Sequence, residues 1–281
     1  MKILVTGANG QLGQEVVAQL NENHQVICCK REELDITNAG KVNEMITSIE
    51  PDWIFHCAAY TNVEAAEDEA KDLNWYVNVT GSANIAKAAK AVNAGLIYIS
   101  TDYVFDGQSL TDYEVEDNTN PINEYGRAKL AGEEEVERNC PGAYIIRTSW
   151  LFGEHGRNFV YTMLNLSTKN TKLKVINDQY GRPTYAYDLA CFMVYIIEKN
   201  HVPPGVYHFS NENHCSWYEF AKTILKNKDV IVEPCDSTEF IQKASRPKRS
   251  VLSLEKVKST GFVIPTWQNA LQRFLNNITK S

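Results

Sequence analysis

Short runs of apolar residues alternate along this chain with longer stretches in which apolar residues recur every three or four positions. The short runs predict buried strands at residues 3–5, 25–29, 53–57, 95–100 and 143–147. The longer stretches predict helices at residues 14–20, 38–49, 74–91 and 125–138. Strands that alternate with helices are typical of a parallel sheet covered by helices on both faces. We therefore predict an α/β fold with a Rossmann-type, doubly wound sheet.

Three glycines lie between the first predicted strand and the first predicted helix. Gly7, Gly10 and Gly13 allow a tight turn and let backbone N–H groups approach a pyrophosphate. The start of the following helix adds free N–H donors and the positive end of a dipole. A plain turn is the alternative, but the strand before the glycines and the helix after them favour a dinucleotide site. The candidate cofactor-binding residues here are Gly7, Asn9, Gly10, Gln11, Leu12 and Gly13.

The alternation becomes less regular in the second half of the chain. Helices are predicted at residues 157–167, 188–198, 217–226 and 266–276, and strands at residues 173–176 and 205–209. Residues 179–184 are predicted to form a polar turn. We therefore predict a dinucleotide-binding domain over residues 1–150 and a smaller α/β region, mainly substrate-binding, over residues 151–281. Later segments of the chain are expected to return to the first domain.

Composition narrows the class of protein. The chain has 281 residues and a formal net charge of −7, which argues against non-specific binding to nucleic acid or to an anionic membrane. No apolar run approaches the length of a membrane span. The seven cysteines form no C-x-x-C pair and the six histidines show no metal-ligand spacing, so we predict reduced cysteines, a cytoplasmic location and no metal.

The end of the second predicted strand bears on the choice of cofactor. An Asp or Glu at this position would favour the ribose 2′-hydroxyl of NAD. Here the strand ends in Lys30 and Arg31, which suit a 2′-phosphate, so NADPH is predicted. The alternative is that both cations are solvated loop residues, and Glu32 and Glu33 follow them directly.

Tyr125 and Lys129 form a pair suited to proton transfer. They are four residues apart on a predicted helix and therefore share one face. Tyrosine is a weak acid, with an ordinary pKa of about 10, and a nearby ammonium is expected to lower that pKa. Thr101 follows the fourth predicted strand, where ligands bind in parallel sheets, and its hydroxyl could hold a carbonyl oxygen near Tyr125. The alternatives are a Tyr–Lys surface pair and a Thr101 that only caps a turn.

The order of these motifs resembles the extended branch of the short-chain dehydrogenase/reductase superfamily. The chain is similar over nearly its whole length to the dTDP-4-dehydrorhamnose reductase family. The residues that carry the resemblance are Gly7–Gly13, 58–67, 100–107 (STDYVFDG), Tyr125–Lys129, 147–150 (RTSW), 181–184 (GRPT) and 246–247.

The resemblance implies a reaction and a set of roles. NADPH or NADH would reduce the C4 ketone of dTDP-4-dehydro-L-rhamnose and give dTDP-L-rhamnose. Tyr125 would be the proton donor, Lys129 would tune it and hold the nicotinamide ribose, and Thr101 would position the ketone. The further cofactor-binding residues implied are Asp35, Ile36, Ala58, Ala59, Tyr60 and Asn78. The substrate-binding residues implied are Thr101, Asp102, Val104, Phe105, Trp150, Asn158, Arg182 and Arg246.

One departure from the family concerns assembly. Some members dimerise through a magnesium ion held by helix glutamates, whereas the helix after the GRPT motif has no Glu before Glu198. We therefore predict a monomer or a weak homodimer.

Other functions remain open at this point. One is another extended-branch activity on a nucleotide sugar: an epimerase, a dehydratase or a different 4-keto reductase. Another is a non-catalytic NADP-binding subunit that resembles the regulatory partner of methionine adenosyltransferase.

Overall fold

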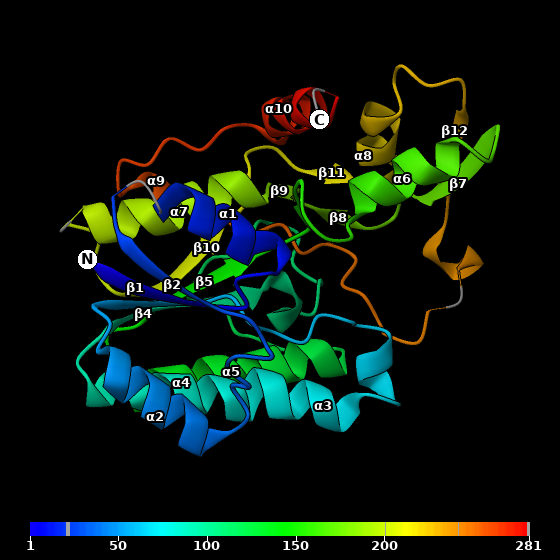
Figure 1. Cartoon of the computed structure of the whole chain (residues 1–281). Helices are drawn as coiled ribbons and strands as arrows, with labels where there is room; N and C mark the ends of the chain where they lie inside the picture. Colours follow the sequence, from blue (N-terminus) through cyan, green and yellow to red (C-terminus); the bar gives the residue numbers. More distant parts are fainter. Residues whose placement is uncertain (21–22, 200, 241, 280–281) are drawn as a thin grey trace.

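The computed structural model describes residues 1–20, 23–199, 201–240 and 242–279, and a six-stranded parallel sheet forms its centre (Figure 1). The order across the sheet is β10-β5-β4-β3-β1-β2. The strands are β1 (Lys2–Thr6), β2 (Gln25–Cys29), β3 (Trp53–His56), β4 (Gly95–Thr101), β5 (Tyr144–Thr148) and β10 (Gly205–Phe209). The chain places β2 on one side of β1 and then crosses to β3 on the other side. This change of direction is the point at which ligands bind in doubly wound sheets, at the carboxyl ends of the strands.

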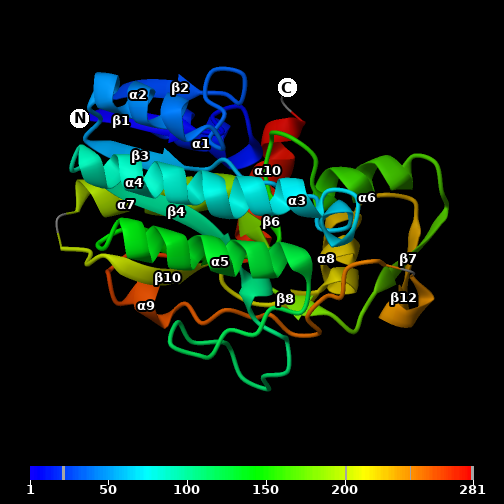
Figure 2. The same cartoon turned by 90° about the horizontal axis from the view of Figure 1, so that it is seen from below.

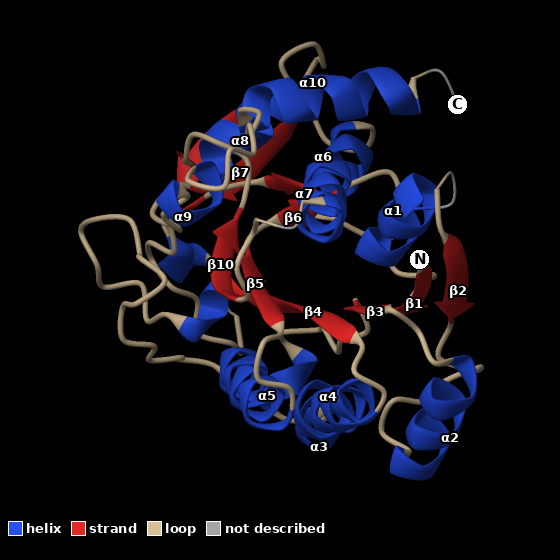
Figure 3. Cartoon of the chain, turned by 90° about the vertical axis from the view of Figure 1, so that its left-hand side faces the viewer, coloured by secondary structure: helices blue, strands red, loops and turns tan. Residues whose placement is uncertain are grey.

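Helices cover both faces of the sheet, as Figure 3 shows end-on. One face carries α1 (Gln11–Leu20) and α7 (Ala186–Glu198), and the other carries α2 (Ala39–Ile49), α4 (Ser82–Ala91) and α5 (Glu124–Asn139). Successive residues of β1 point into two different hydrophobic cores. Ile3 and Val5 pack against α1 and α7, whereas Leu4 packs in the core under α2 and α4. Burial on both faces explains why these strands are continuous apolar runs. The predicted Rossmann-type fold is confirmed.

A smaller group of elements lies beyond the carboxyl ends of the strands (Figures 1 and 2). Its helices are α6 (Phe159–Ser167), α8 (Trp217–Ile224) and α10 (Trp267–Ile278), and its main strands are β7 (Lys172–Ile176) and β12 (Ile231–Cys235), which pair in parallel. The short strands are β6 (Leu151–Phe152), β8 (Tyr180–Gly181), β9 (Thr184–Tyr185) and β11 (Cys215–Ser216). Phe152, Phe220 and Phe274 form part of its separate core. In contrast, α7 and β10 return to the large sheet.

Several predicted elements differ from those observed. The helix predicted over residues 74–91 begins earlier as α3 (Lys71–Trp75), continues as a π-helical segment (Tyr76–Gly81) and ends as α4. The polar turn predicted at residues 179–184 contains β8 and the first residue of β9. The strand β12 and the short helix α9 (Glu255–Lys258) were not predicted, nor were the 3-10 turns Ala65–Glu67, Asp102–Val104 and Ser237–Glu239. Among the described helices, none combines the length and hydropathy that crossing a bilayer requires.

Candidate active site

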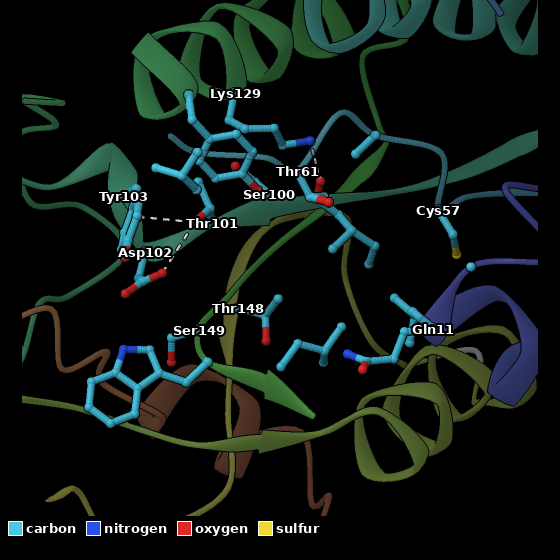
Figure 4. A pocket seen from close by; sticks show the side chains of 18 of the residues that line it. Gln11, Cys57, Thr61, Ser100, Thr101, Asp102, Tyr103, Lys129, Thr148 and Ser149 are labelled. Atoms are coloured by element: carbon cyan, nitrogen blue, oxygen red, sulfur yellow. Dashed lines mark hydrogen bonds between the residues drawn. The ribbon is translucent and has the colours of Figure 1, made fainter. Parts of the chain in front are cut away.

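Two adjoining cavities open at the carboxyl ends of the strands. The larger has a volume of about 630 Å³ and the smaller about 520 Å³. Gly10, Cys57 and Ala59 line both, so the two cavities meet beside the glycine turn. Figure 4 shows the larger one, with Gln11 of α1 on one side and Thr101 and Lys129 on the other.

The glycine turn is packed too closely for side chains. Gly7 has a φ of +64°, and a Cβ added to it would lie 2.7 Å from the Ala58 nitrogen. A Cβ on Gly13 would lie 2.2 Å from the Gly7 carbonyl oxygen. The Gly10 amide donates to that same oxygen at 2.9 Å. Backbone therefore forms the cavity wall here, which is the requirement for a close approach to a pyrophosphate.

The smaller cavity contains most of the residues expected around an adenosine. Gly7, Asn9, Arg31, Asp35, Ile36, Ala58 and Tyr60 line it, together with Leu34, Thr37, Leu73, Tyr76 and Val77, which the sequence did not single out. Of the two predicted cations, Arg31 lines this cavity and Lys30 does not. The Thr37 hydroxyl and amide donate to Asp35, and these hydrogen bonds hold the Asp35 pKa below its usual range.

Asn78 contributes from behind the cavity wall. Its side-chain amide donates to the Tyr60 carbonyl at 3.0 Å and accepts from the Tyr60 amide at 3.1 Å. Asn78 also donates to Asn74 at 2.8 Å. This buried pair fixes the segment after β3, so Asn78 acts on the cofactor wall through Tyr60.

Thr101, Tyr125 and Lys129 all line the larger cavity. Asn123 caps α5 by accepting from the Gly126 amide at 2.7 Å, and this cap sets the first turn that carries Tyr125. Lys129, on the next turn, donates from Nζ to the Ile99 carbonyl at 2.7 Å. The Thr101 hydroxyl accepts from the Tyr103 amide at 3.2 Å and donates to Asp102 at 3.2 Å. Thr101 therefore both caps this turn and lines the cavity.

The pKa of Tyr125 differs in direction from the sequence-based expectation. Burial is the main cause that raises it, the Asp102 charge raises it further, and a hydrogen bond with Thr101 opposes them. Lys129 instead has its own pKa lowered to about 7, because its side chain is buried. The expectation that Lys129 lowers the Tyr125 pKa is wrong for this arrangement. The phenol stays protonated at neutral pH, which is the form that a proton donor needs.

Asp102 is a second acid at the same wall. It is 2% exposed, and burial raises its pKa to about 7. The Ser250 hydroxyl donates to one carboxyl oxygen, and Thr101 donates to the other. Near neutral pH this carboxyl is therefore partly protonated next to Tyr125 and Thr101.

Aromatic side chains form the opposite wall. Trp150 has a φ of +47° and stacks on Trp217 with ring centroids 3.5 Å apart. A Cβ on Gly181 would lie 2.5 Å from the Trp150 ring, so the glycine of the GRPT motif leaves room for the indole. Arg246 also lines this cavity and pairs with Glu64 at 2.7 Å.

Four of the predicted substrate contacts do not line the larger cavity. Val104 and Phe105 are 0% exposed and pack with Tyr113 and Leu252, so the prediction that they line the cavity is wrong. Asn158 caps α6, and Arg182 pairs with Asp112 at 2.7 Å. Neither Asn158 nor Arg182 lines the cavity.

The family model described as RmlD substrate binding domain matches residues 1–280. The chain belongs to this family. The spore coat polysaccharide biosynthesis protein SpsK of Bacillus subtilis (strain 168) is 36% identical, over 98% of this chain and 96% of its own length. The dTDP-4-dehydrorhamnose reductase of Aggregatibacter actinomycetemcomitans is 38% identical, over 96% of this chain and 97% of its own.

Solved structures of dTDP-4-dehydrorhamnose reductases have the same fold as this chain. A dTDP-4-dehydrorhamnose reductase from Clostridium acetobutylicum has a TM-score of 0.96 at 41% identity, covering 99% of this chain and 100% of that one. The enzyme of that name from Bacillus anthracis str. Ames, solved in complex with NADP, has a TM-score of 0.95 at 41% identity and covers 98% and 99%. The resemblance to dTDP-4-dehydrorhamnose reductases is confirmed.

The RmlD-type cavity contains residues that the sequence reasoning missed. They are Cys57, Thr61, Val63, Ile99, Ser100, Tyr103, Thr148, Ser149, Leu151, Arg157, Phe159 and Trp217. Thr148 and Ser149 belong to the RTSW motif, so a search of every strand end would have found them. Arg157, Phe159 and Trp217 lie in the smaller region, and nothing in their local pattern indicates that they face the sheet.

Proposed function

We propose that this protein is an NADPH-dependent reductase that converts the C4 ketone of dTDP-4-dehydro-L-rhamnose to the alcohol of dTDP-L-rhamnose. The observation that supports this most is the position of Tyr125, a phenol kept protonated in the cavity that the glycine turn borders. Thr101 and Lys129 line the same cavity. The names and coverage of the relatives supply the substrate class.

The cofactor fits the smaller cavity and its junction with the larger one. Side chains at positions 7 and 13 would fill the space beside the glycine turn. Because both residues are glycines, the backbone of the turn can approach a pyrophosphate. Arg31 would bind the 2′-phosphate, Tyr60 and Ile36 would border the adenosine, and Lys129 would hold the nicotinamide ribose. When bound, NADPH supplies the hydride for the ketone carbon. A relative that is 41% identical was solved with NADP, which supports this choice.

The residues of this chain handle the oxygen of the ketone. Thr101 donates a hydrogen bond to that oxygen and holds it near Tyr125. Tyr125 transfers its phenolic proton to the oxygen as negative charge develops there, which contributes roughly 10²–10⁴-fold to the rate. Trp150 and Trp217 exclude water on the sugar side. Arg246 is placed to bind a phosphate oxygen, in competition with Glu64.

Other 4-keto sugars are the second candidate substrates. A relative named dTDP-4-keto-6-deoxy-D-glucose reductase from Streptomyces niveus is 35% identical over 95% of this chain. The assembly as a monomer or weak homodimer and the cytoplasmic location both stay predictions.

The test is a spectrophotometric assay of NADPH oxidation. dTDP-4-dehydro-L-rhamnose is generated in place from dTDP-glucose by a dehydratase and an epimerase, and a parallel reaction omits the epimerase. Oxidation that requires this protein and the epimerase, with dTDP-rhamnose as product, supports the proposal. Equal rates without the epimerase would move the assignment to the 4-keto-6-deoxy-glucose substrate. Cofactor binding with no oxidation of either would favour a non-catalytic subunit.

A further inference from the structure

A third side chain continues the row that Tyr125 and Lys129 form on α5. Glu133 follows Lys129 by four residues, so all three lie on one face of the helix. Glu133 is 5% exposed and Lys129 is 2% exposed. Neither cavity is lined by Glu133. A carboxylate buried behind the cavity wall requires a partner, because burial without one is costly.

Arg147 of β5 is that partner. Its Nε donates to both Glu133 oxygens at 3.0 and 3.2 Å, and its Nη2 donates to one of them at 2.8 Å. The guanidinium is held from its other sides by the Val115 carbonyl at 3.3 Å and by the Phe105 ring, 5.2 Å from its centroid. His208 lies 3.4 Å from Nη1, and burial lowers the His208 pKa to about 3, so this imidazole is neutral. The forked contact pairs the Glu133 carboxyl group with Arg147 and fixes its position.

The groups that face Lys129 come from three elements. On β4, the Tyr98 ring centroid lies 4.1 Å from Nζ, and the Ile99 carbonyl accepts its proton. From β3, His56 is neutral, because burial and then the Lys129 charge lower its pKa to about 3. On α5 itself stand Tyr125 and Glu133. Tyr98 and Tyr125 are both protonated phenols, because burial raises the pKa of each.

The charge balance around Lys129 therefore depends on Glu133. Burial lowers the Lys129 pKa to about 7, and the Glu133 carboxylate opposes this loss. Among the described groups that act on Lys129, Glu133 is the one that carries a negative charge. Without it, no carboxylate would remain among the described groups that act on the buried Lys129 ammonium. Lys129 would then hold its proton less well at neutral pH.

We propose that Glu133, fixed by Arg147, is a positioning residue that keeps Lys129 charged beneath the cavity. Lys129, Glu133 and Arg147 form a buried row of alternating charge that joins α5 to β5. The use of the Lys129 charge, to hold the cofactor ribose, rests on the proposed function. The charge itself is a property of the protein alone and can be measured without cofactor or substrate.

The test is the titration of Lys129 in the full chain, followed by NMR of lysine labelled with ¹³C at Cε. The Lys129 signal is identified by its loss in Lys129→Met. In Glu133→Gln we expect the Lys129 midpoint to fall by about one pH unit or more, because an opposite charge has been removed from a buried site. Glu134→Gln is the matched control, since it removes the same charge from the next, exposed position of α5. Equal midpoints in the wild type, Glu133→Gln and Glu134→Gln would overturn the proposal.

Two further variants keep the test decisive if Glu133→Gln does not fold. Glu133→Gln combined with Arg147→Gln removes the Arg147 charge together with that of its partner, so no guanidinium is left without its carboxylate, and the Lys129 midpoint should still fall. Glu133→Asp keeps the charge, so its midpoint should lie closer to that of the wild type than the midpoint of either neutral variant. A neutral double variant that titrates like the wild type would contradict the assignment.

The kinetic arm separates this inference from the proposed function. The alkaline limb of the rate profile for NADPH oxidation should move to lower pH in Glu133→Gln and stay in place in Glu134→Gln. A purely structural role would lower the rate at every pH and leave the limb unmoved, which counts against the inference. A wild-type protein that oxidises no NADPH would count against the proposed function, and the Lys129 titration would then decide the inference.

Discussion

At the residue scale, burial decides what the motif residues can do. The spacing of Tyr125 and Lys129 could be read from the sequence, and both side chains do line the cavity. The direction of the Tyr125 pKa shift could not be read from the sequence. It depends on the burial of the phenol and on Asp102, which lies in a different turn. The motif STDYVFDG likewise pointed to Val104 and Phe105. A 3-10 turn over Asp102–Val104 leads both side chains into the core, and a sequence motif does not reveal which way a turn directs its residues.

Arg31 offers a test of the predicted cofactor preference. Arg31→Gln should weaken NADPH binding by about tenfold or more and change NADH binding little, because it removes a charge-assisted contact to the 2′-phosphate alone. The measurement is a fluorescence titration with each cofactor. Lys30→Gln is the matched control, since Lys30 does not line the cavity. Equal losses for NADPH and NADH, or none, would contradict the assignment of Arg31.

At the element scale, the parallel sheet was predictable because most of its strands are buried on both faces. The ranges 25–29 and 205–209 agree with β2 and β10 residue for residue. The strand β12 was missed because its sequence, IVEPC, interrupts the apolar run with an acidic residue and a proline. The π-helical segment Tyr76–Gly81 was missed because its extra residue per turn depends on packing against α5. The local sequence does not reveal this tertiary contact.

The glycine turn allows a matched test of element packing. Gly13→Ala should destabilise the protein by about 1–3 kcal/mol and weaken NADPH binding, because its Cβ would meet the Gly7 backbone at 2.2 Å. Gly40→Ala is the control, since its Cβ would have only a side-chain atom at 3.5 Å and lies in α2, where alanine is favoured. Urea unfolding and NADPH titration measure both effects. A Gly13→Ala protein with wild-type stability and affinity would show that the turn is not packed as described.

At the scale of the whole molecule, a carboxyl pair lies where the sheet domain meets the smaller region. Glu15 of α1 faces Glu154, which accepts hydrogen bonds from Tyr185 of β9 and Asn277 of α10. His155 lies 3.8 Å from Glu15. Burial first, and then the charge of Glu154, raise the Glu15 pKa to about 7. Glu15 and Glu154 lie far apart in the sequence, and no sequence pattern predicts that they are in contact.

This pair predicts how stability changes with pH. The folded state keeps a proton on Glu15 that the unfolded chain releases above about pH 4.5, so the free energy of unfolding should fall as the pH rises from 4.5 to 7. Glu15→Gln removes this loss. Its stability relative to the wild type should improve over that range by on the order of 1–3 kcal/mol. Urea unfolding at several pH values measures it, with Glu44→Gln on an exposed turn of α2 as control. Parallel pH profiles for the wild type and both variants would refute the effect.

The most direct test of the whole account is the turnover of Tyr125→Phe with NADPH and dTDP-4-dehydro-L-rhamnose. We expect a kcat at least about a hundredfold below that of the wild type, because the proton donor is lost. NADPH affinity should stay near the wild-type value, since the ring remains. Tyr195→Phe is the control, since its hydroxyl donates to the Thr260 carbonyl outside the cavity. A Tyr125→Phe enzyme that turns over at the wild-type rate would contradict the assignment of Tyr125 as the acid.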